Sequence, residues 1–392
     1  MTPADGAKRI LITGGAGFIG SRLALALRAR GHDVTVLDNL SPQIHTADPE
    51  HSSLYRSIAG KVRFVRGDVT SRDDMTAALS GQQVIVHLAA ETGTGQSMYE
   101  IERYCRVNIG GTALLLDLLA NDKTSVERVV VASSRAVYGE GKYLSEELGP
   151  VYPGHRSAED MSAGDFEVHY PGCSKPLRLV ATDEESRVHP SSVYGITKQN
   201  QEQLVMTMCP TIGIAPVAFR YQNVYGPGQS LSNPYTGILS IFSNLAMGGQ
   251  PINVFEDGRE SRDFVFIDDV VRATTLGIEQ EAAANQVFNV GAGTPVDVLT
   301  VARTITRNIG VEVPITVTGN FRLGDIRHNF ACLRKIEARL GYRPEFDFER
   351  GVALFCQWAR TQGTAQSDFA RSLDELESKG LLKKAAADPR PA

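Results

Sequence analysis

The segment SSVYGITKQNQE, residues 191–202, contains a tyrosine and a lysine four positions apart, Tyr194 and Lys198. In a helix, positions i and i+4 lie on one face, about one turn apart. A phenol has a pKa near 10, and a neighbouring ammonium group lowers that value because it favours the phenolate. Such a pair could therefore exchange a proton with a substrate hydroxyl near neutral pH. The same spacing is common on solvated helix faces, so the rest of the chain must decide between the two interpretations.

The first forty residues predict one βαβ unit. RILIT (9–13) is a short run of branched apolar residues, typical of a buried strand, and a glycine-rich turn follows it. The leucine-rich SRLALALRAR (21–30) predicts a helix, which Gly31 would end. DVTVLD (33–38) predicts a second strand.

The glycine turn of this unit predicts a dinucleotide site. Gly14, Gly17 and Gly20 let the backbone turn tightly, approach a pyrophosphate closely and pack a helix on a strand. The helix N-terminus then directs its free N–H groups at the phosphates. Asp38 ends the second strand, where it can accept hydrogen bonds from a ribose and would repel a 2′-phosphate. The unit therefore favours NAD over NADP.

Composition excludes several other classes of function. The 392 residues are 42% hydrophobic and 22% charged, which is ordinary for a globular enzyme. The net charge of −5 and the lack of a basic stripe argue against nucleic-acid binding. The five cysteines are scattered and form no CxxC pair, which suits the reducing cytoplasm. The N-terminal residues lack the apolar run of a signal peptide, and no stretch is long and apolar enough to predict a membrane span.

The glycine spacing and later motifs resemble those of the extended short-chain dehydrogenase/reductases, the family of NAD-dependent sugar-nucleotide epimerases and dehydratases. The matching motifs run from about residue 8 to about 330 and are FVRGDV (64–69), VIVHLAA (84–90), RVNIGGT (106–112), VVVASSRAVYG (129–139), YGITK (194–198), FRYQNVYGPGQ (219–229), FEDGRESRDFVFIDDV (255–270) and FNVGAG (288–293). The resemblance implies an α/β fold with a Rossmann-type, doubly wound parallel sheet and a smaller C-terminal substrate-binding lobe.

The resemblance also implies a division of the chain. Residues 1–224 would form the NAD-binding domain, interrupted by an insertion at about 140–190, and residues 225–360 would mainly form the substrate lobe, with some segments returning to the first domain. Residues 361–392 read as a C-terminal helix and frayed tail. The helices expected around 101–120 and 194–208 carry more apolar surface than one face needs, as in the relatives' dimer interface, so we expect a homodimer.

By the same resemblance, the cofactor NAD would be held by residues from the glycine turn, the strand ends and the active-site helices. These residues are Gly14, Gly17, Phe18, Ile19, Gly20, Asp38, Asn39, Asp68, Val69, Leu88, Ala89, Ala90, Asn108, Tyr194, Lys198 and Tyr221.

The resemblance makes Ser134, Tyr194 and Lys198 the catalytic residues. Tyr194 would act as acid and base, with its pKa lowered by Lys198 and by the positive nicotinamide, and Ser134 would hydrogen-bond the reacting oxygen. Sugar 4,6-dehydratases carry Thr-Asp-Glu where this chain has Ser134, Arg135 and Ala136. Elimination of water needs an acid and a base beyond the tyrosine, so the sequence favours a nucleotide-sugar 4-epimerase over a dehydratase.

The substrate would be a dTDP- or UDP-linked sugar, and several motifs resemble epimerases that act on dTDP-L-rhamnose. Its expected contacts are Thr94, Gln96, Ser134, Arg135, Asn223, Arg262 and Arg322, with Arg327 as a weaker candidate. Arginine suits a diphosphate because its planar fork donates paired, charge-assisted hydrogen bonds. A reductase, a decarboxylase and a non-catalytic NAD-binding sensor remain alternatives. The insertion retains only Cys173 where similar insertions carry paired cysteines, so we expect a structural flap without a metal.

Overall fold

The centre of the structure is a seven-stranded sheet in which every neighbouring pair of strands is parallel. The computed structural model describes residues 6–45, 48–233, 235, 237–364, 369–384 and 390–391. The strands of the sheet are β1 (Arg9–Thr13), β2 (Asp33–Asp38), β3 (Arg63–Arg66), β4 (Val84–His87), β5 (Arg128–Ser134), β9 (Ala215–Tyr221) and β13 (Gln286–Val290). β1, β4 and β5 are apolar and buried along most of their length, as expected of strands covered on both faces.

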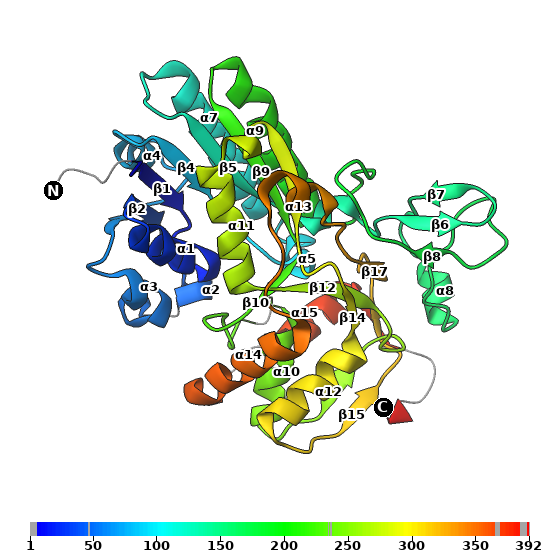
Figure 1. Ribbon diagram of the computed structural model, residues 1–392. Coiled ribbons are helices and arrows are strands. Elements are labelled where there is room, and N and C mark those ends of the chain that lie inside the picture. Colours follow the sequence, from blue (N-terminus) through cyan, green and yellow to red (C-terminus); the bar gives the residue numbers. More distant parts are fainter. Residues whose placement is uncertain are drawn as a thin grey trace.

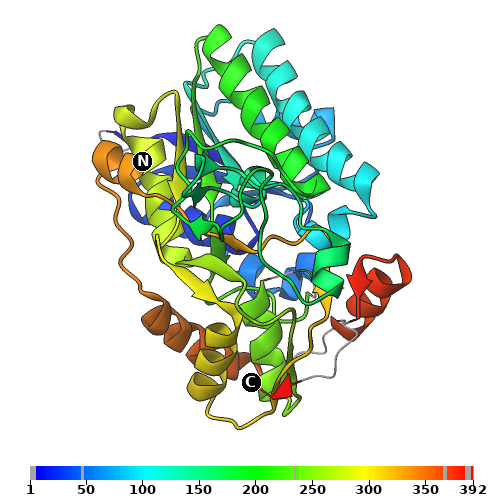
Figure 2. The same ribbon diagram turned by 90° about the vertical axis from the view of Figure 1, so that its right-hand side faces the viewer.

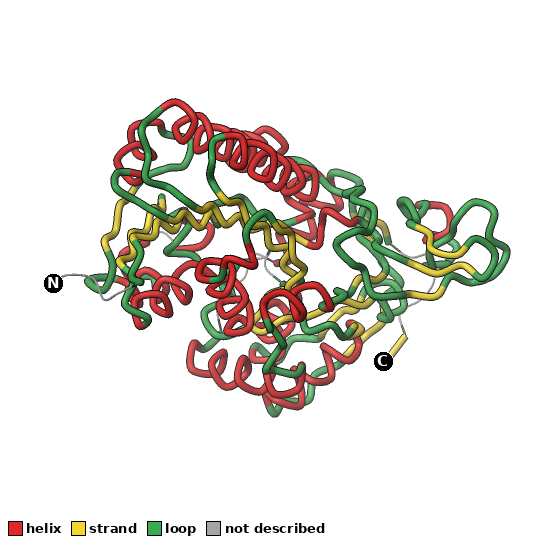
Figure 3. Tube along the Cα trace, turned by 45° about the horizontal axis from the view of Figure 1, so that its top comes forward, coloured by secondary structure: helices red, strands yellow, loops and turns green. Residues whose placement is uncertain are grey.

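The strand order is β13-β9-β5-β4-β1-β2-β3, so the winding reverses between β1 and β4. Helices cover both faces of the sheet (Figures 1 and 3). One face carries α4 (Arg72–Leu79), α7 (Gly111–Asn121) and α9 (Val193–Thr211), and the other carries α1 (Phe18–Ala29), α3 (Ser53–Ile58) and α11 (Ile267–Glu279). The doubly wound Rossmann-type sheet predicted from the sequence is confirmed. Ligands bind to such sheets outside the carboxyl ends of the strands at the reversal point.

A second group of short sheets and helices lies beside the carboxyl ends of the large sheet (Figure 1). Its strands are β10 (Asn223–Tyr225), β12 (Ser261–Phe266), β14 (Pro295–Asp297) and β17 (His328–Asn329), with β11 (Ile252–Val254), β15 (Ile315–Val317) and β19 (Arg390–Pro391) in another sheet. Its helices are α10 (Ile238–Met247), α12 (Val298–Ile309) and α14 (Phe348–Gln362), whereas α13 (Arg334–Leu340) packs against β13 of the large sheet.

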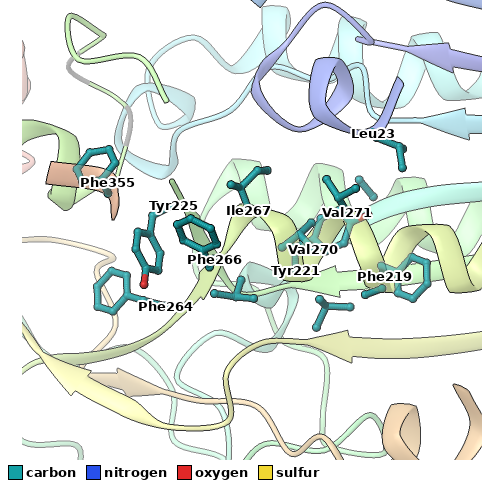
Figure 4. Close-up of a cluster of buried hydrophobic side chains, with 14 of the residues drawn as sticks. Leu23, Phe219, Tyr221, Tyr225, Phe264, Phe266, Ile267, Val270, Val271 and Phe355 are labelled. Atoms are coloured by element: carbon teal, nitrogen blue, oxygen red, sulfur yellow. The ribbon is translucent and has the colours of Figure 1, made fainter. Parts of the chain in front are cut away.

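Aromatic side chains join this second group to the core beneath the sheet. Tyr225 packs edge-on against Phe266, with ring centroids 5.7 Å apart, and against Phe355 at 6.4 Å. Figure 4 shows these rings continuing toward Ile267, Val270 and Phe219. One continuous apolar core therefore runs from the face of the large sheet into the second group, which fixes the cavity between them.

The insertion folds as a small unit of its own, which projects from the body in Figure 1. It contains β6 (Tyr143–Ser145), β7 (Gly149–Val151), β8 (Arg178–Leu179) and α8 (Ala158–Ser162), with a small core of its own. Arg156 of the insertion makes a bidentate pair with Glu256, at 2.7 Å to each oxygen. The insertion is therefore fixed by buried ion pairs to the segment that precedes β12.

The remaining elements are short connections and the C-terminal segment. They are α2 (Pro42–His45), η1 (Pro49–His51), α5 (Thr94–Ser97), α6 (Ile101–Tyr104), the π-helix η2 (Cys105–Gly110), η3 (Arg135–Tyr138), η4 (Glu281–Ala283), β16 (Phe321–Arg322), α15 (Phe369–Ser378) and β18 (Leu382–Lys383). No helix within the described ranges has the length and apolar character needed to span a membrane.

The C-terminal segment differs from the sequence prediction. The sequence suggested a helix beginning near Asp374 and a frayed tail, but α15 begins at Phe369, and β18 pairs antiparallel with β16. Part of the expected tail, residues 385–389 and 392, lies outside the described residues.

Candidate active site

A cavity of about 410 Å³ lies at the carboxyl ends of β1, β2, β4 and β5, where the winding of the sheet reverses. Fifteen of the sixteen residues predicted to hold the cofactor line it; Asn108 alone of that set does not. Ser134 lines the same cavity. The tertiary structure thus brings together the glycine turn, the strand ends and the face of α9 that carries Tyr194 and Lys198.

The glycine turn has no room for side chains. Gly14 has a φ of 67°, and a Cβ there would lie 2.8 Å from the backbone of Ala89. A Cβ at Gly20 would lie 2.4 Å from the carbonyl oxygen of Gly14. These contacts let the start of α1 pack against the strand ends while the bare backbone faces the cavity, as a pyrophosphate requires.

The acidic residues at the ends of β2 and β3 are held in place by local hydrogen bonds. Asp38 accepts hydrogen bonds from the backbone N–H groups of Ala16 at 3.0 Å and Leu40 at 2.8 Å, so its carboxylate is fixed beside the glycine turn. Burial alone would raise the pKa of Asp68, but hydrogen bonds from Thr70 and Asn39 lower it overall. Asp68 therefore stays ionised, and both side chains are held in a fixed orientation at the cavity wall.

Helix α9 presents Tyr194 and Lys198 to the cavity from its first two turns. Ser192 caps the helix and accepts a hydrogen bond from Gly195 N–H at 3.1 Å, which fixes where the helix begins. The backbone N–H of Tyr194 donates to Ser97 Oγ at 3.0 Å, which ties the helix to α5. The Tyr194 hydroxyl hydrogen-bonds Ser134, so the pair predicted to act on one substrate oxygen already interacts.

Lys198 is only 3% exposed, and its ammonium has two acceptors. Nζ donates to the carbonyl oxygen of Ala132 at 2.8 Å and to Gln201 Oε1 at 2.9 Å. Burial lowers the pKa of Lys198 to about 7. The lysine can therefore change protonation state near neutral pH.

A chain of buried hydrogen bonds fixes the orientation of Gln201. Gln201 Nε2 donates to Thr112 Oγ1 at 2.8 Å, and Thr112 Oγ1 donates to the carbonyl oxygen of Asn108 at 2.6 Å. The Thr112 hydroxyl has then used its only proton, so His87 Nε2, 3.0 Å away, must donate to it. His87 Nδ1 in turn accepts from Thr13 Oγ1 at 2.8 Å. Gln201 therefore turns its oxygen toward Lys198.

The groups that act on Tyr194 differ from the prediction. Burial raises the pKa of its phenol overall, and the hydrogen bond with Ser134 and the positive charge of Arg135 offset part of this increase. The sequence predicted that Lys198 lowers the pKa of Tyr194, but the Lys198 ammonium donates its hydrogen bonds to Ala132 and Gln201. The charge of Arg135 thus favours the Tyr194 phenolate, and the part predicted for Lys198 stays a prediction.

The arginines predicted to contact the substrate gather around one carboxylate. Burial alone would raise the pKa of Asp325, but the charges of Arg322, Arg262, Arg156 and Arg135 lower it overall. Arg322 Nε lies 3.2 Å from Asp325 Oδ2. Arg262 donates to the backbone carbonyls of Ser261, Ile326 and Arg327. This excess of positive charge beside Tyr194 suits a diphosphate.

Arg327, the weaker candidate, has a different environment. Its guanidinium is fully buried and donates to Glu167, Asp257 and Glu256. Because these carboxylates engage the whole fork, we assign Arg327 to the attachment of the insertion rather than to the substrate.

The other predicted residues lie around the cavity. Asn108 is buried behind the wall, where it bonds the backbone of Glu91 and donates to Thr197 Oγ1. Gln96 exchanges hydrogen bonds with Gln43, which does line the cavity. Thr94 and Arg322 line a second, narrower cavity next to Asp325.

Two glutamines were missed by the sequence reasoning. Gln222 and Gln229 line the main cavity and are only 4% and 6% exposed. Within the described residues, both side-chain polar atoms of Gln222, the oxygen of Gln229 and the oxygen of the predicted residue Asn223 have no hydrogen-bond partner. Buried polar atoms without partners are costly, so they mark places where a ligand can bind. Their position in FRYQNVYGPGQ, beside Asn223, was the available signal.

The insertion holds no metal-ligand cluster among its described side chains, and the same is true of the rest of the described chain. The Cys173 thiol donates to Ser145 Oγ at 3.0 Å.

Comparison with known proteins defines the class of protein. The chain matches the model of the NAD dependent epimerase/dehydratase family over residues 10–157 and 169–291, and it belongs to that family. It is 40% identical over 353 residues to a dTDP-L-rhamnose 4-epimerase of Burkholderia thailandensis, covering 90% of this chain and 94% of that protein. A dTDP-glucose 4,6-dehydratase of Streptomyces niveus is 29% identical over 90% of this chain and 93% of its own length.

Solved structures give the same grouping. The UDP-glucose 4-epimerase of Thermotoga maritima, solved with UDP-glucose, superimposes with a TM-score of 0.73 at 27% identity, over 90% of this chain and 99% of that chain. The protein MoeE5, solved with UDP-glucuronic acid and NAD, gives a TM-score of 0.71 at 28% identity with the same coverage.

The residues of the main cavity fit NAD, the cofactor of the family. A Cβ at Gly14 or Gly20 would fill the turn that faces the phosphates, Asp38 lies fixed at the end of β2, and Gln222 has unpartnered polar atoms. The prediction of NAD as cofactor is confirmed.

Proposed function

We propose that this protein is an NAD-dependent nucleotide-sugar 4-epimerase, and that dTDP-L-rhamnose is the first substrate to test. The observation that carries the proposal is the hydrogen bond between Tyr194 and Ser134. Arg135 and Ala136 follow Ser134 at the two positions where a dehydratase would carry carboxylates. A proton-transfer group with a hydrogen-bonding serine suffices to oxidise and reduce one carbon, whereas elimination of water needs further acids. The choice of sugar rests on the relative from Burkholderia thailandensis.

In this proposal Tyr194 takes the proton of the sugar hydroxyl and later returns it to the ketone oxygen. Ser134 hydrogen-bonds the same oxygen and stabilises the charge that develops on it. Lys198 and Asp38 hold the ribose hydroxyls of the dinucleotide, and the glycine turn holds its pyrophosphate. NAD, when bound, supplies the hydride acceptor and donor for C4 of the sugar.

Arg135, Arg262 and Arg322 bind the diphosphate of the substrate. Their combined positive charge at Asp325 supports this assignment, because a diphosphate would balance it. The part of the cavity that would bind the sugar is lined or supported by Thr94, Gln96 and Asn223.

We further propose the division into an NAD-binding part (1–224, with the insertion), a substrate part (mainly 225–360) and a C-terminal part (361–392). The apolar contacts between the large sheet and the second group support a rigid cleft between the first two parts.

We also propose a cytoplasmic homodimer. The exposure of Ile101 (52%) on α6 and Ile196 (45%) on α9 supports an isologous contact through these helices.

The test is incubation of purified protein with a panel of dTDP- and UDP-sugars without added cofactor, followed by product analysis by NMR. The expected product is the C4 epimer. A requirement for external NADH would indicate a reductase, release of carbon dioxide a decarboxylase, and no turnover with bound NAD a sensor.

A further inference from the structure

The C-terminal segment Phe369–Lys383 contacts both sides of the proposed substrate site. Figure 2 shows α15 in red beside the cyan residues near position 100, apart from α12 and α14. No sequence motif predicts this placement, because a charged C-terminal helix is usually an exposed appendage. Three sets of contacts define its place.

The first set of contacts is a cluster of two tyrosines and one carboxylate. Tyr235 OH donates to Glu375 Oε2 at 2.9 Å, and Tyr99 OH lies 3.2 Å from the same oxygen. The two tyrosine hydroxyls are themselves 2.8 Å apart. Tyr235 lines the main cavity, and Tyr99 follows α5, which begins at the predicted substrate residue Thr94. Glu375 therefore connects two loops of the site that are far apart in the sequence.

The negative charge of Glu375 sets the direction of the hydrogen bonds in this cluster. A carboxylate accepts and cannot donate, so it fixes the protons of the two hydroxyls toward itself or along the tyrosine pair. The Tyr235 hydroxyl lowers the pKa of Glu375, so the carboxylate stays ionised. Lys379, which directly follows α15, lies 5.0 Å from the centre of the Tyr99 ring and contacts that ring from the same segment.

The second set of contacts is with the strand that carries Arg322. Residues 321 and 322 of β16 pair with residues 383 and 382 of β18, and Leu323 N–H donates to the Leu381 carbonyl oxygen at 2.9 Å. The C-terminal segment thus completes the small sheet that positions the proposed diphosphate ligand Arg322.

The third set of contacts is apolar. Leu376 is 5% exposed and packs against Gly95, where an added Cβ would lie 3.6 Å from a Leu376 methyl group. Leu376 and Leu381 line the narrower cavity together with Thr94, Arg322 and Asp325. One segment therefore contributes apolar, ionic and backbone contacts to the same wall.

We propose that Phe369–Lys383 is a structural part of the nucleotide-sugar site and that Glu375 is a positioning residue for Tyr99 and Tyr235. The identity of the ligand rests on the proposed function, but the placement of the segment does not. Glu375 acts through the two tyrosines, so its loss should weaken binding of the sugar nucleotide without removing proton transfer at Tyr194.

The matched pair of variants is Glu375→Gln and Glu377→Gln. Both lie on α15, but Glu377 pairs with Lys384 on the exposed side of the helix. We expect Glu375→Gln to raise KM about tenfold, since charge-assisted hydrogen bonds are lost, with kcat within about twofold. Glu377→Gln should match the wild type. If Glu375→Gln does not fold, Tyr99→Phe removes the same contact from the other side and should raise KM alike.

A second measurement keeps this proposal separate from the proposed function. Amide hydrogen exchange of residues 369–383 is followed in the NAD-loaded protein with and without dTDP or UDP. We expect slower exchange with the nucleotide that binds, even if no sugar of the panel is epimerised. Unchanged exchange with a nucleotide that does bind, or a KM of Glu375→Gln equal to that of Glu377→Gln, would overturn the placement. Failure of turnover alone would overturn only the proposed function.

Discussion

The burial of Lys198 predicts that the proposed catalytic lysine destabilises the cofactor-free protein. Lys198 has an ordinary pKa of 10.5 and a folded-state pKa of about 7, because its ammonium is buried. At about 1.4 kcal/mol per pH unit, this difference corresponds to about 5 kcal/mol of lost stability when the lysine must be charged, as an upper estimate. Lys198→Met keeps the length of the side chain and removes the charge. We therefore expect Lys198→Met to raise the free energy of unfolding below pH 7 while abolishing epimerase activity.

The pH dependence gives the sign of the effect. Because the folded pKa of Lys198 lies below its unfolded value, the unfolded chain binds more protons between pH 7 and about 10. The cost of charging the buried lysine is full below pH 7 and disappears as the pH rises through the unfolded pKa. The advantage of Lys198→Met should therefore be largest at pH 6 and shrink steadily toward pH 10. His87 stays neutral across this range, since burial and the charge of Lys198 lower its pKa to about 3.

The assay is urea unfolding of the NAD-free wild type and variant at pH 6, 7.5 and 9, after refolding without cofactor. The exposed Lys123 provides the control, because Lys123→Met removes a lysine that is already in water. Taking the difference between variant and wild type removes the contribution of other titrating groups. A stability difference that does not change with pH, or one that equals the Lys123 control, would refute the reasoning.

Further predictions concern the proposed active site and the interface. Tyr194→Phe should leave NAD binding intact and lower kcat by about 10²–10⁴-fold, the range for a lost acid/base step, in steady-state assays. Ser134→Ala should cost about ten- to a thousandfold in kcat, since one donor to the developing oxyanion is lost. Arg135→Met should move the acidic limb of the kcat/KM profile to higher pH, because Arg135 lowers the pKa of Tyr194; an unmoved limb would contradict that role. Ile196→Glu should shift the sedimenting species from dimer to monomer, and a wild type that is monomeric at micromolar concentration would contradict the interface. Substrate deuterated at C4 should keep its label in the epimer, and loss of the label to solvent would indicate enolisation.

Much of the fold and of the cavity could be read from local sequence. The strand, glycine turn, helix and acid of residues 9–38 have conformational requirements that depend on near neighbours only, and the structure places them as predicted. Parallel strands bring their carboxyl ends to one edge, so residues that follow each apolar run had to meet there. Tyr194 and Lys198 share a face of α9 for the same local reason.

Properties that depend on contacts between distant residues could not be predicted from local sequence. The oxygen of Gln201 faces Lys198 only because Thr112, on another element, accepts from the Gln201 amide, and His87 in turn fixes Thr112. The charge of Arg135 lowers the pKa of Tyr194, and the Lys198 ammonium donates to the carbonyl oxygen of Ala132; neither contact could be predicted from local sequence.

The C-terminal segment shows most clearly where prediction from local sequence ends. Tyr99 meets Tyr235 across 136 residues and Glu375 across 276 residues of sequence. No periodicity or motif encodes such a meeting, because each of the three residues is an ordinary surface residue in its own segment. The sequence by itself determined the cofactor-binding unit and pointed to Tyr194 as the proposed proton-transfer group. The tertiary structure decided which charges surround that group and which distant segment completes the wall of the site, because burial and long-range packing set both.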